Sequence, residues 1–293
     1  MKIAYLIDKE AIGGGNDYIR RQMAAHSDDS CRVFYADRGE CTAKAMNDYG
    51  ANLISVNHLR ALVQLFRNPF VRPQGEVVFT VHGIHLRKYD FLPQTILNRI
   101  KRILRLLLER KLYHRCSRLI ALTPTDANDI HRLYGEDLAV RVEPNSICTS
   151  ELSAAPTDLR WPPDSFAYVM IARNDFQKGQ DILFAALEFA AKRLRATGSR
   201  VLLIGGAEVP ASIADLVENA GPIPDAGVYM TCGRTLIAPS RWEGMPYLLL
   251  EAVARGRDII AADCPGNRDV LAGYGKARMF PAGDAASLSE MLK

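Results

Sequence analysis

The sequence has no C-x-x-C pair and no zinc-ligand spacing among its six cysteines, so neither a redox dithiol nor a structural zinc site is expected. Thiols scattered without a disulfide framework favour a reducing, cytoplasmic setting. No apolar run approaches the length that crosses a bilayer, and the five apolar residues within MKIAYLID are too few for a secretory signal. We therefore expect a cytoplasmic protein, with the inner face of the membrane as an alternative location.

Several short signatures of common enzyme classes are also missing. The sequence contains no P-loop, no H-E-x-x-H and no G-x-S-x-G, which argues against an NTPase, a zinc protease and an esterase. What is present is ordinary for a globular protein, with 24% charged and 48% apolar residues. A length of 293 residues is typical of two domains, each large enough for its own core.

Short apolar runs alternate with helical stretches along the chain, which predicts an α/β protein with doubly wound parallel sheets. The expected strands are Ile3–Ile7, Arg32–Ala36, Asn52–Val56, Val77–Val81, Leu119–Leu122 and Ala139–Val142, then Phe166–Ile171, Arg200–Ile204, Thr235–Ala238 and Asp258–Ala262. Prolines 156, 162 and 163 mark a linker between the two series. We predict Rossmann-like domains at 1–150 and 165–293, joined by a linker at 151–164 and facing a central cleft. Ligands of such sheets bind beyond the carboxyl ends of the strands.

The most informative stretch is LIAPSRWEGMPYLLLEAVARG, residues 236–256. It predicts a strand, a loop over 239–245 and a helix that begins at Pro246 and ends before Gly256. The first N–H groups of a helix and the positive end of its dipole form a natural site for a diphosphate. Glu243 and Glu251 bracket this helix start, and carboxylates accept hydrogen bonds from sugar hydroxyls. The stretch therefore predicts a nucleotide-sugar site.

The residues SRWEGMPYLLLEAVARG resemble the E-x7-E signature of the retaining GT-B glycosyltransferases of family 4. The resemblance implies a GT-B-like fold in which Glu251 holds the ribose of the donor nucleotide and Glu243 faces the transferred sugar. It further implies that backbone groups meet sugar hydroxyls and phosphate at Gly244, Met245, Pro246 and Tyr247.

Two cations follow the first predicted strand of the second domain, in MIARNDFQKGQDILFAAL. Arg173 and Lys178 flank a loop that enters a helix, where fixed positive charge can stabilise a departing diphosphate without a metal. The pattern resembles the family's G-R-x…K-G segment, whose Arg and Lys hold the donor diphosphate. Ala172 stands where the family usually has glycine.

The first domain offers weaker signals. His82 follows the predicted strand Val77–Val81 and can donate one hydrogen bond and accept another; in the family, a histidine in a matching T-x-H context contacts the donor sugar. Gly13, Gly14 and Gly15 permit a close backbone approach, and in the resemblance this loop closes over donor phosphate and acceptor. A dehydrogenase is the alternative, with Asp37 as the ribose ligand. However, GGGND is not G-x-G-x-x-G, and five residues separate it from the strand.

Positive charge is concentrated in the first domain. Residues 1–150 carry 22 Lys and Arg against 16 Asp and Glu, whereas residues 151–293 carry 15 against 17. Much of the excess lies in residues 99–118, where basic side chains interleave with Ile100, Ile103, Leu104, Leu107, Leu108 and Leu112. We expect an amphipathic helix whose apolar stripe covers the sheet. Peripheral contact with an anionic membrane remains an alternative. Nucleic acid is not an expected partner, because no aromatic and basic platform is present.

These observations predict a retaining glycosyltransferase that moves a sugar from a nucleoside diphosphate sugar, of UDP or GDP type, to a glycan or lipid-linked acceptor. The sequence has no D-x-D, the metal-binding pattern of the other glycosyltransferase architecture, so no metal and no cofactor is expected. The alternative is a non-catalytic nucleotide-sugar-binding subunit or sensor, since the family's long C-terminal tail has no counterpart here.

Overall fold

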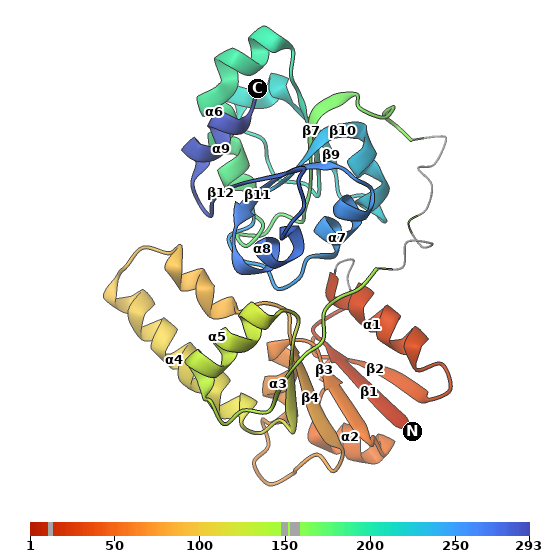
Figure 1. Cartoon of the computed structure of the whole chain (residues 1–293). Helices are drawn as coiled ribbons and strands as arrows, with labels where there is room; N and C mark the ends of the chain where they lie inside the picture. Colours follow the sequence, from red (N-terminus) through yellow and green to blue (C-terminus); the bar gives the residue numbers. More distant parts are fainter. Residues whose placement is uncertain (11–13, 148–151, 153–158) are drawn as a thin grey trace. The chain divides into compact units, whose positions relative to one another are not determined.

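The structure is a computed structural model that describes residues 1–10, 14–147, 152 and 159–293. Residue contacts divide the chain into two compact units, Met1–Asn145 and Ser146–Lys293 (Figure 1). Most of the predicted linker at 151–164 lies outside the described residues. Each unit holds one parallel six-stranded sheet with helices packed against it, so the prediction of two Rossmann-like α/β sheets is confirmed.

The sheet of the first unit has the strand order β2-β1-β3-β4-β5-β6. Its strands are β1 (Lys2–Ile7), β2 (Ser30–Tyr35), β3 (Leu53–Val56), β4 (Glu76–Val81), β5 (Arg118–Ala121) and β6 (Val140–Val142). Its helices are α1 (Gly14–Ala25), α2 (Ala43–Tyr49), α3 (Leu59–Leu65), the 3₁₀ helix η1 (His85–Asp90), α4 (Ile96–Tyr113) and α5 (Pro124–Tyr134). The strand order reverses at β1 and β3, which is where ligands of such sheets bind.

The second unit has the order β12-β11-β10-β7-β8-β9, which is the Rossmann order. Its strands are β7 (Phe166–Ile171), β8 (Val201–Ile204), β9 (Val217–Gly221), β10 (Gly233–Ala238), β11 (Asp258–Asp263) and β12 (Ala277–Pro281). Its helices are α6 (Gln180–Thr197), α7 (Tyr247–Ala254), α8 (Pro265–Leu271) and α9 (Ala285–Met291), with 3₁₀ helices η3 (Ala211–Leu216) and η4 (Ala226–Cys232). Here the order reverses between β7 and β10.

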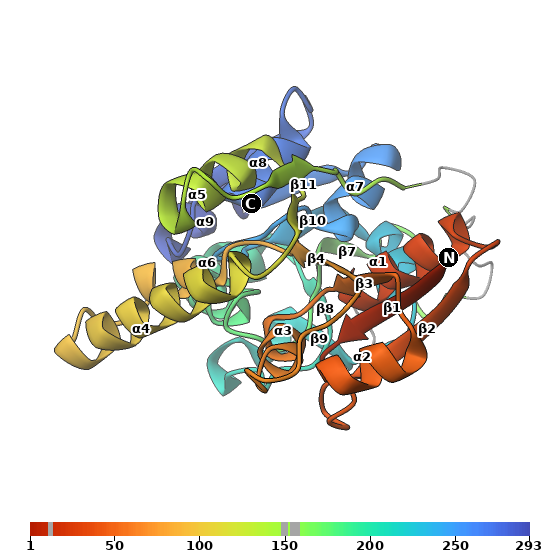
Figure 2. The same cartoon turned by 90° about the horizontal axis from the view of Figure 1, so that it is seen from below.

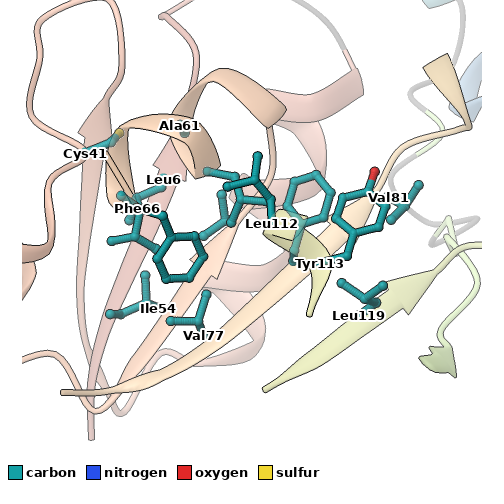
Figure 3. Close-up of a cluster of buried hydrophobic side chains, with 14 of the residues drawn as sticks. Leu6, Cys41, Ile54, Ala61, Phe66, Val77, Val81, Leu112, Tyr113 and Leu119 are labelled. Carbon is teal, nitrogen blue, oxygen red and sulfur yellow. The ribbon is translucent and has the colours of Figure 1, made fainter. Parts of the chain in front are cut away.

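The inner strands of both sheets are apolar because helices cover both faces of each sheet. In β1, Ile3, Ala4 and Leu6 are completely buried, and the same holds for Val201, Leu202 and Leu203 of β8. Figure 3 shows how the core of the first unit gathers side chains from distant segments, with Leu112 and Tyr113 of α4 in one cluster with Leu6, Val81 and Leu119 of the sheet.

One prediction about the basic helix is wrong. The apolar stripe of α4 does not cover the sheet: Ile96, Leu97, Ile100, Ile103, Leu104, Leu107 and Leu108 are all exposed. The physical reason is that α4 is anchored by its opposite face, through the buried residues Glu109, Leu112 and Tyr113. Tyr134 of α5 holds this end in place, since its ring lies 4.7 Å from that of Tyr113 and its hydroxyl donates to Glu109 Oε2 at 2.6 Å. The N-terminal part of α4 projects away from the strands of its unit (Figure 2).

Smaller differences concern the ends and edges of elements. Helix α7 begins at Tyr247, with Pro246 as its N-cap rather than its first residue. The edge strands β9 and β12 are absent from the expected set, because VENAG is polar and ARMFP is short and ends in proline. Among the described residues, no helix combines the length and hydropathy needed to cross a membrane.

Candidate functional site in the second unit

The candidate site of the second unit lies where its strand order reverses. Strands β7 and β10 pair in parallel, with Thr235 opposite Tyr168 and Leu236 opposite Val169, so their carboxyl ends lie side by side. The loop after β7 carries Lys178, and the loop after β10 carries Glu243. Two segments 65 residues apart in the sequence are therefore brought together at the edge of the sheet where Rossmann-like proteins bind nucleotides.

An ion pair joins the two loops. Lys178 Nζ lies 2.6 Å from Glu243 Oε1, and Gln177 Nε2 donates to Glu243 Oε2 at 3.3 Å and to the carbonyl of Trp242 at 2.9 Å. Glu243 is only 7% exposed, and a buried carboxylate needs such partners to offset its lost hydration. The pair therefore fixes the side chains of the predicted sugar-facing glutamate and the predicted phosphate-binding lysine relative to each other.

Further contacts hold the loops at this distance. The Arg241 N–H donates to the carbonyl of Gln177 at 2.8 Å, and its guanidinium binds Asp181 of α6 at 2.9 Å. Gly179, the N-cap of α6, has φ +70°, and a Cβ there would lie 2.2 Å from the carbonyl oxygen of Pro239. Only glycine allows both this left-handed backbone and this close approach.

The start of α7 completes the site. Pro246 caps the helix without a side-chain hydrogen bond, and Met245, Pro246 and Tyr247 are partly exposed. Gly266 of α8 packs against this loop so closely that a Cβ would lie 2.0 Å from the Gly244 carbonyl oxygen. A cavity of about 30 Å³ is lined by Lys178, Glu243 and Pro246. That is about the volume of one water molecule.

Two predicted ligands lie outside this cavity. Arg173 is exposed in the loop after β7, and Glu251 lies one turn further along α7 than Tyr247. Glu251 Oε2 is next to η4, where a Cβ on Gly227 would lie 2.6 Å from it. Neither residue lines the cavity. The structure therefore brings Lys178, Glu243 and the loop before α7 together, whereas Arg173 and Glu251 are not among the residues that line the cavity.

Candidate functional site in the first unit

His82 follows β4, and its neighbours are Asn57, which directly follows β3, and Tyr18 of α1. Its Nε2 lies 3.4 Å from Asn57 Oδ1, and the edge of its ring meets Tyr18 with centroids 5.0 Å apart. Asn57 Nδ2 donates to the carbonyl and to the hydroxyl oxygen of Ser55, both at 3.2 Å, so Oδ1 is left as an acceptor. His82 Nε2 must therefore carry the proton, which leaves Nδ1 as a hydrogen-bond acceptor.

The imidazole is neutral at ordinary pH. Burial, with a smaller contribution from repulsion by the neighbouring His85 and His58, lowers the pKa of His82 from 6.5 to about 4. A neutral ring with one N–H and one free lone pair suits a sugar hydroxyl, as the sequence suggested.

The glycines of the first domain are only partly described. Gly14 and Gly15 open helix α1, one turn before Tyr18, whereas Gly13 lies outside the described residues. The helix expected near 17–25 therefore begins three residues earlier, and it includes two of the three glycines. Through Tyr18 this helix start lies close to His82.

A second cavity, lined by both polar and apolar side chains and including His82 in its wall, was not predicted from the sequence. It holds about 130 Å³ and is lined by Asn57, His82, Arg105 and Glu109, among others. Glu109 is almost fully buried, pairs with Arg105 and accepts from the hydroxyl of Tyr134. One feature of the sequence indicates this cavity: Glu109 is the sole acidic residue of α4 and lies on the side opposite the apolar stripe.

Among the described residues, no three His, Cys, Asp or Glu side chains are grouped as metal ligands. Cysteines 31, 41, 116, 232 and 264 are all free thiols.

Comparison with known proteins

Solved structures share this fold. Sucrose-phosphate synthase (tll1590) from Thermosynechococcus elongatus has a TM-score of 0.79 at 18% identity, covering 99% of this chain and 88% of that one. Anabaena Alr3699/HepE in complex with UDP and glucose has a TM-score of 0.74 at 18% identity, covering 100% and 89%. At this identity the likeness defines the fold, which is that of the GT-B glycosyltransferases.

Sequence comparison gives a glycosyltransferase match over the second unit. Residues 166–293 match the family model described as "Glycosyl transferases group 1". Phosphatidyl-myo-inositol mannosyltransferase of Mycobacterium leprae is 28% identical, over 58% of this chain and 51% of that protein. The chain spans about half the length of this curated relative. The second unit therefore matches the group 1 glycosyl transferases and the whole chain has a GT-B fold, which supports the resemblance to GT-B glycosyltransferases and disfavours the dehydrogenase.

Proposed function

We propose that this protein is a retaining glycosyltransferase that transfers a sugar from a nucleoside diphosphate sugar to a glycan or lipid-linked acceptor without a metal. The observation that carries the proposal is the Lys178–Glu243 pair at the strand-order reversal of the second unit. It supplies a cation for the diphosphate and a carboxylate for the sugar beside the start of a helix whose dipole favours phosphate.

The roles follow from the chemistry of each group. Lys178, with Arg173 nearby, neutralises charge on the leaving diphosphate, as fixed cations do without reorganisation. Glu243 accepts hydrogen bonds from hydroxyls of the transferred sugar, and Glu251 accepts those of the ribose. In the first unit, His82 binds a sugar hydroxyl through its N–H and its free Nδ1. These assignments rest on the family resemblance together with the positions described above.

The reaction needs no separate general base in this scheme. The bond between the anomeric carbon and the diphosphate oxygen breaks, and the acceptor oxygen attacks from the same face. The acceptor proton passes to the departing diphosphate, so atoms and charge balance. We expect the nucleotide to be UDP or GDP. UDP is the nucleotide bound in the Anabaena HepE complex, which has the same fold, and both nucleotides occur in the donors of the family that the sequence resembles. We place the protein in the cytoplasm, with the basic first unit in peripheral contact with the inner face of the membrane.

Ligand-induced stabilisation tests the proposal. A nucleotide at about 100 times its Kd stabilises the folded state by about 2.7 kcal/mol, which corresponds to a rise in melting temperature of roughly 5 to 10 °C. We expect this rise with UDP or GDP and none with NAD. A rise with NAD alone would overturn the proposal.

A further inference from the structure

The exposed apolar stripe of α4 has no counterpart elsewhere on the described helices. The seven side chains of this stripe are 43% to 78% exposed: Ile96, Leu97, Ile100, Ile103, Leu104, Leu107 and Leu108. At 100° per residue they occupy roughly 140° of the helix circumference, directly opposite the face that carries Glu109, Leu112 and Tyr113. Along the axis the stripe runs for roughly 18 Å. A contiguous apolar surface of this kind marks an interaction site.

The charges around the stripe indicate what it binds. Lys101 flanks one edge of the stripe, Arg99 and Arg110 flank the other, and Lys111 follows the stripe at its C-terminal end, beyond Leu108. All four are exposed, and their side chains form no ion pair within the described residues. The one acidic residue of α4, Glu109, is buried and paired with Arg105. The outer surface of α4 is thus apolar at its centre and positively charged at both edges.

We infer that this outer face of α4 is the surface by which the protein docks on an anionic lipid bilayer. An interfacial helix buries its apolar face at the boundary of headgroups and acyl chains while basic side chains meet anionic headgroups. A second copy of the chain fits less well, because pairing two such helices would place Arg99, Lys101 and Arg110 beside the same cations of the partner copy, with no exposed carboxylate on α4 to offset them. The inference gives the proposed membrane contact a defined surface.

Vesicle co-sedimentation of the whole chain tests the inference. We expect binding to vesicles of phosphatidylglycerol and phosphatidylcholine, weak binding to phosphatidylcholine alone, and weaker binding at about 0.5 M salt. Leu104→Ser combined with Leu107→Ser removes apolar contact, and Arg99→Glu combined with Lys101→Glu reverses charge. Each pair is expected to lower the partition coefficient at least tenfold, the leucine pair through lost apolar burial and the charge pair through lost attraction to the anionic headgroups.

The matched control is Phe189→Ser, which removes an equally exposed apolar side chain from α6 of the second unit. It is expected to leave vesicle binding unchanged. All of these variants keep the nucleotide-induced rise in melting temperature, so failure of the docking surface is distinguishable from failure of the proposed function. Equal binding to neutral and anionic vesicles, or an effect of Phe189→Ser as large as that of the α4 pairs, would overturn the inference. So would a concentration-dependent dimer that the leucine pair abolishes without any vesicle binding.

Discussion

Lys178 Nζ and Glu243 Oε1 are 2.6 Å apart although 65 residues separate them in the chain. The contact joins the loops that follow two adjacent parallel strands, β7 and β10. Glu243 is buried, whereas Lys178 retains about a quarter of its side-chain exposure. The ammonium can therefore reach a ligand while the carboxylate orients it, and several consequences can be measured.

The first is energetic coupling within the pair. Lys178→Ala leaves the buried Glu243 carboxylate without a cation, with Gln177 as its remaining side-chain partner. In the double variant Lys178→Ala/Glu243→Gln the negative charge is also removed, so no buried charge is left without a counter-ion. We expect the two substitutions to be non-additive by roughly 1 to 3 kcal/mol in the free energy of unfolding, measured with urea. Additivity to within about 0.5 kcal/mol would mean that the two charges do not interact in solution.

The close approach of α8 to the loop before α7 is a second test. Gly266→Ala would place a methyl group 2.0 Å from the Gly244 carbonyl, so the loop must move. We expect a loss of roughly 1 to 3 kcal/mol in stability, together with weaker nucleotide binding by calorimetry. Gly275→Ala is the control, because a Cβ at Gly275 meets nothing within 4 Å. Equal behaviour of the two variants would contradict the observed packing.

A third prediction concerns pH. The pKa of His82 is about 4 in the folded protein and about 6.5 in an unfolded chain. Between these values the unfolded chain binds a proton that the folded ring does not, so stability falls as pH drops from 6.5 toward 4. The loss reaches up to about 3 kcal/mol near pH 4, and His82→Gln should remove it from urea-unfolding curves. His131→Gln, which retains His82, should keep the slope of the parent protein. The prediction fails if the two variants show the same slope.

Metal removal is the fourth test. If Lys178 and Arg173 supply the charge that the leaving diphosphate needs, release of nucleoside diphosphate should be unchanged in the presence of EDTA. Restoration of a lost rate by Mg²⁺ or Mn²⁺ would show that a metal shares this task.

The sequence predicts the two Rossmann-like sheets because buried parallel strands such as Ile3–Ile7 and Phe166–Ile171 read as unbroken apolar runs. It also places Lys178 and Glu243 at strand ends, since both follow such runs. Their direct contact could not be predicted, because it depends on the strand order that puts β10 beside β7. The outward face of α4 was misread for a similar reason. Amphipathicity shows that a helix has an apolar side, but the anchoring contact between Tyr134 and Glu109 decides which side packs.

The most direct test of the central claim is the rate at which nucleoside diphosphate is released from a panel of UDP- and GDP-sugars. We expect the parent protein to turn over at least one donor and Lys178→Ala to lower kcat/KM at least roughly a hundredfold, because the stabilisation it removes acts on developing charge. Lys192→Ala, which removes an exposed lysine of α6, should match the parent protein. Nucleotide binding without any turnover, or a Lys178→Ala variant as active as Lys192→Ala, would contradict the account.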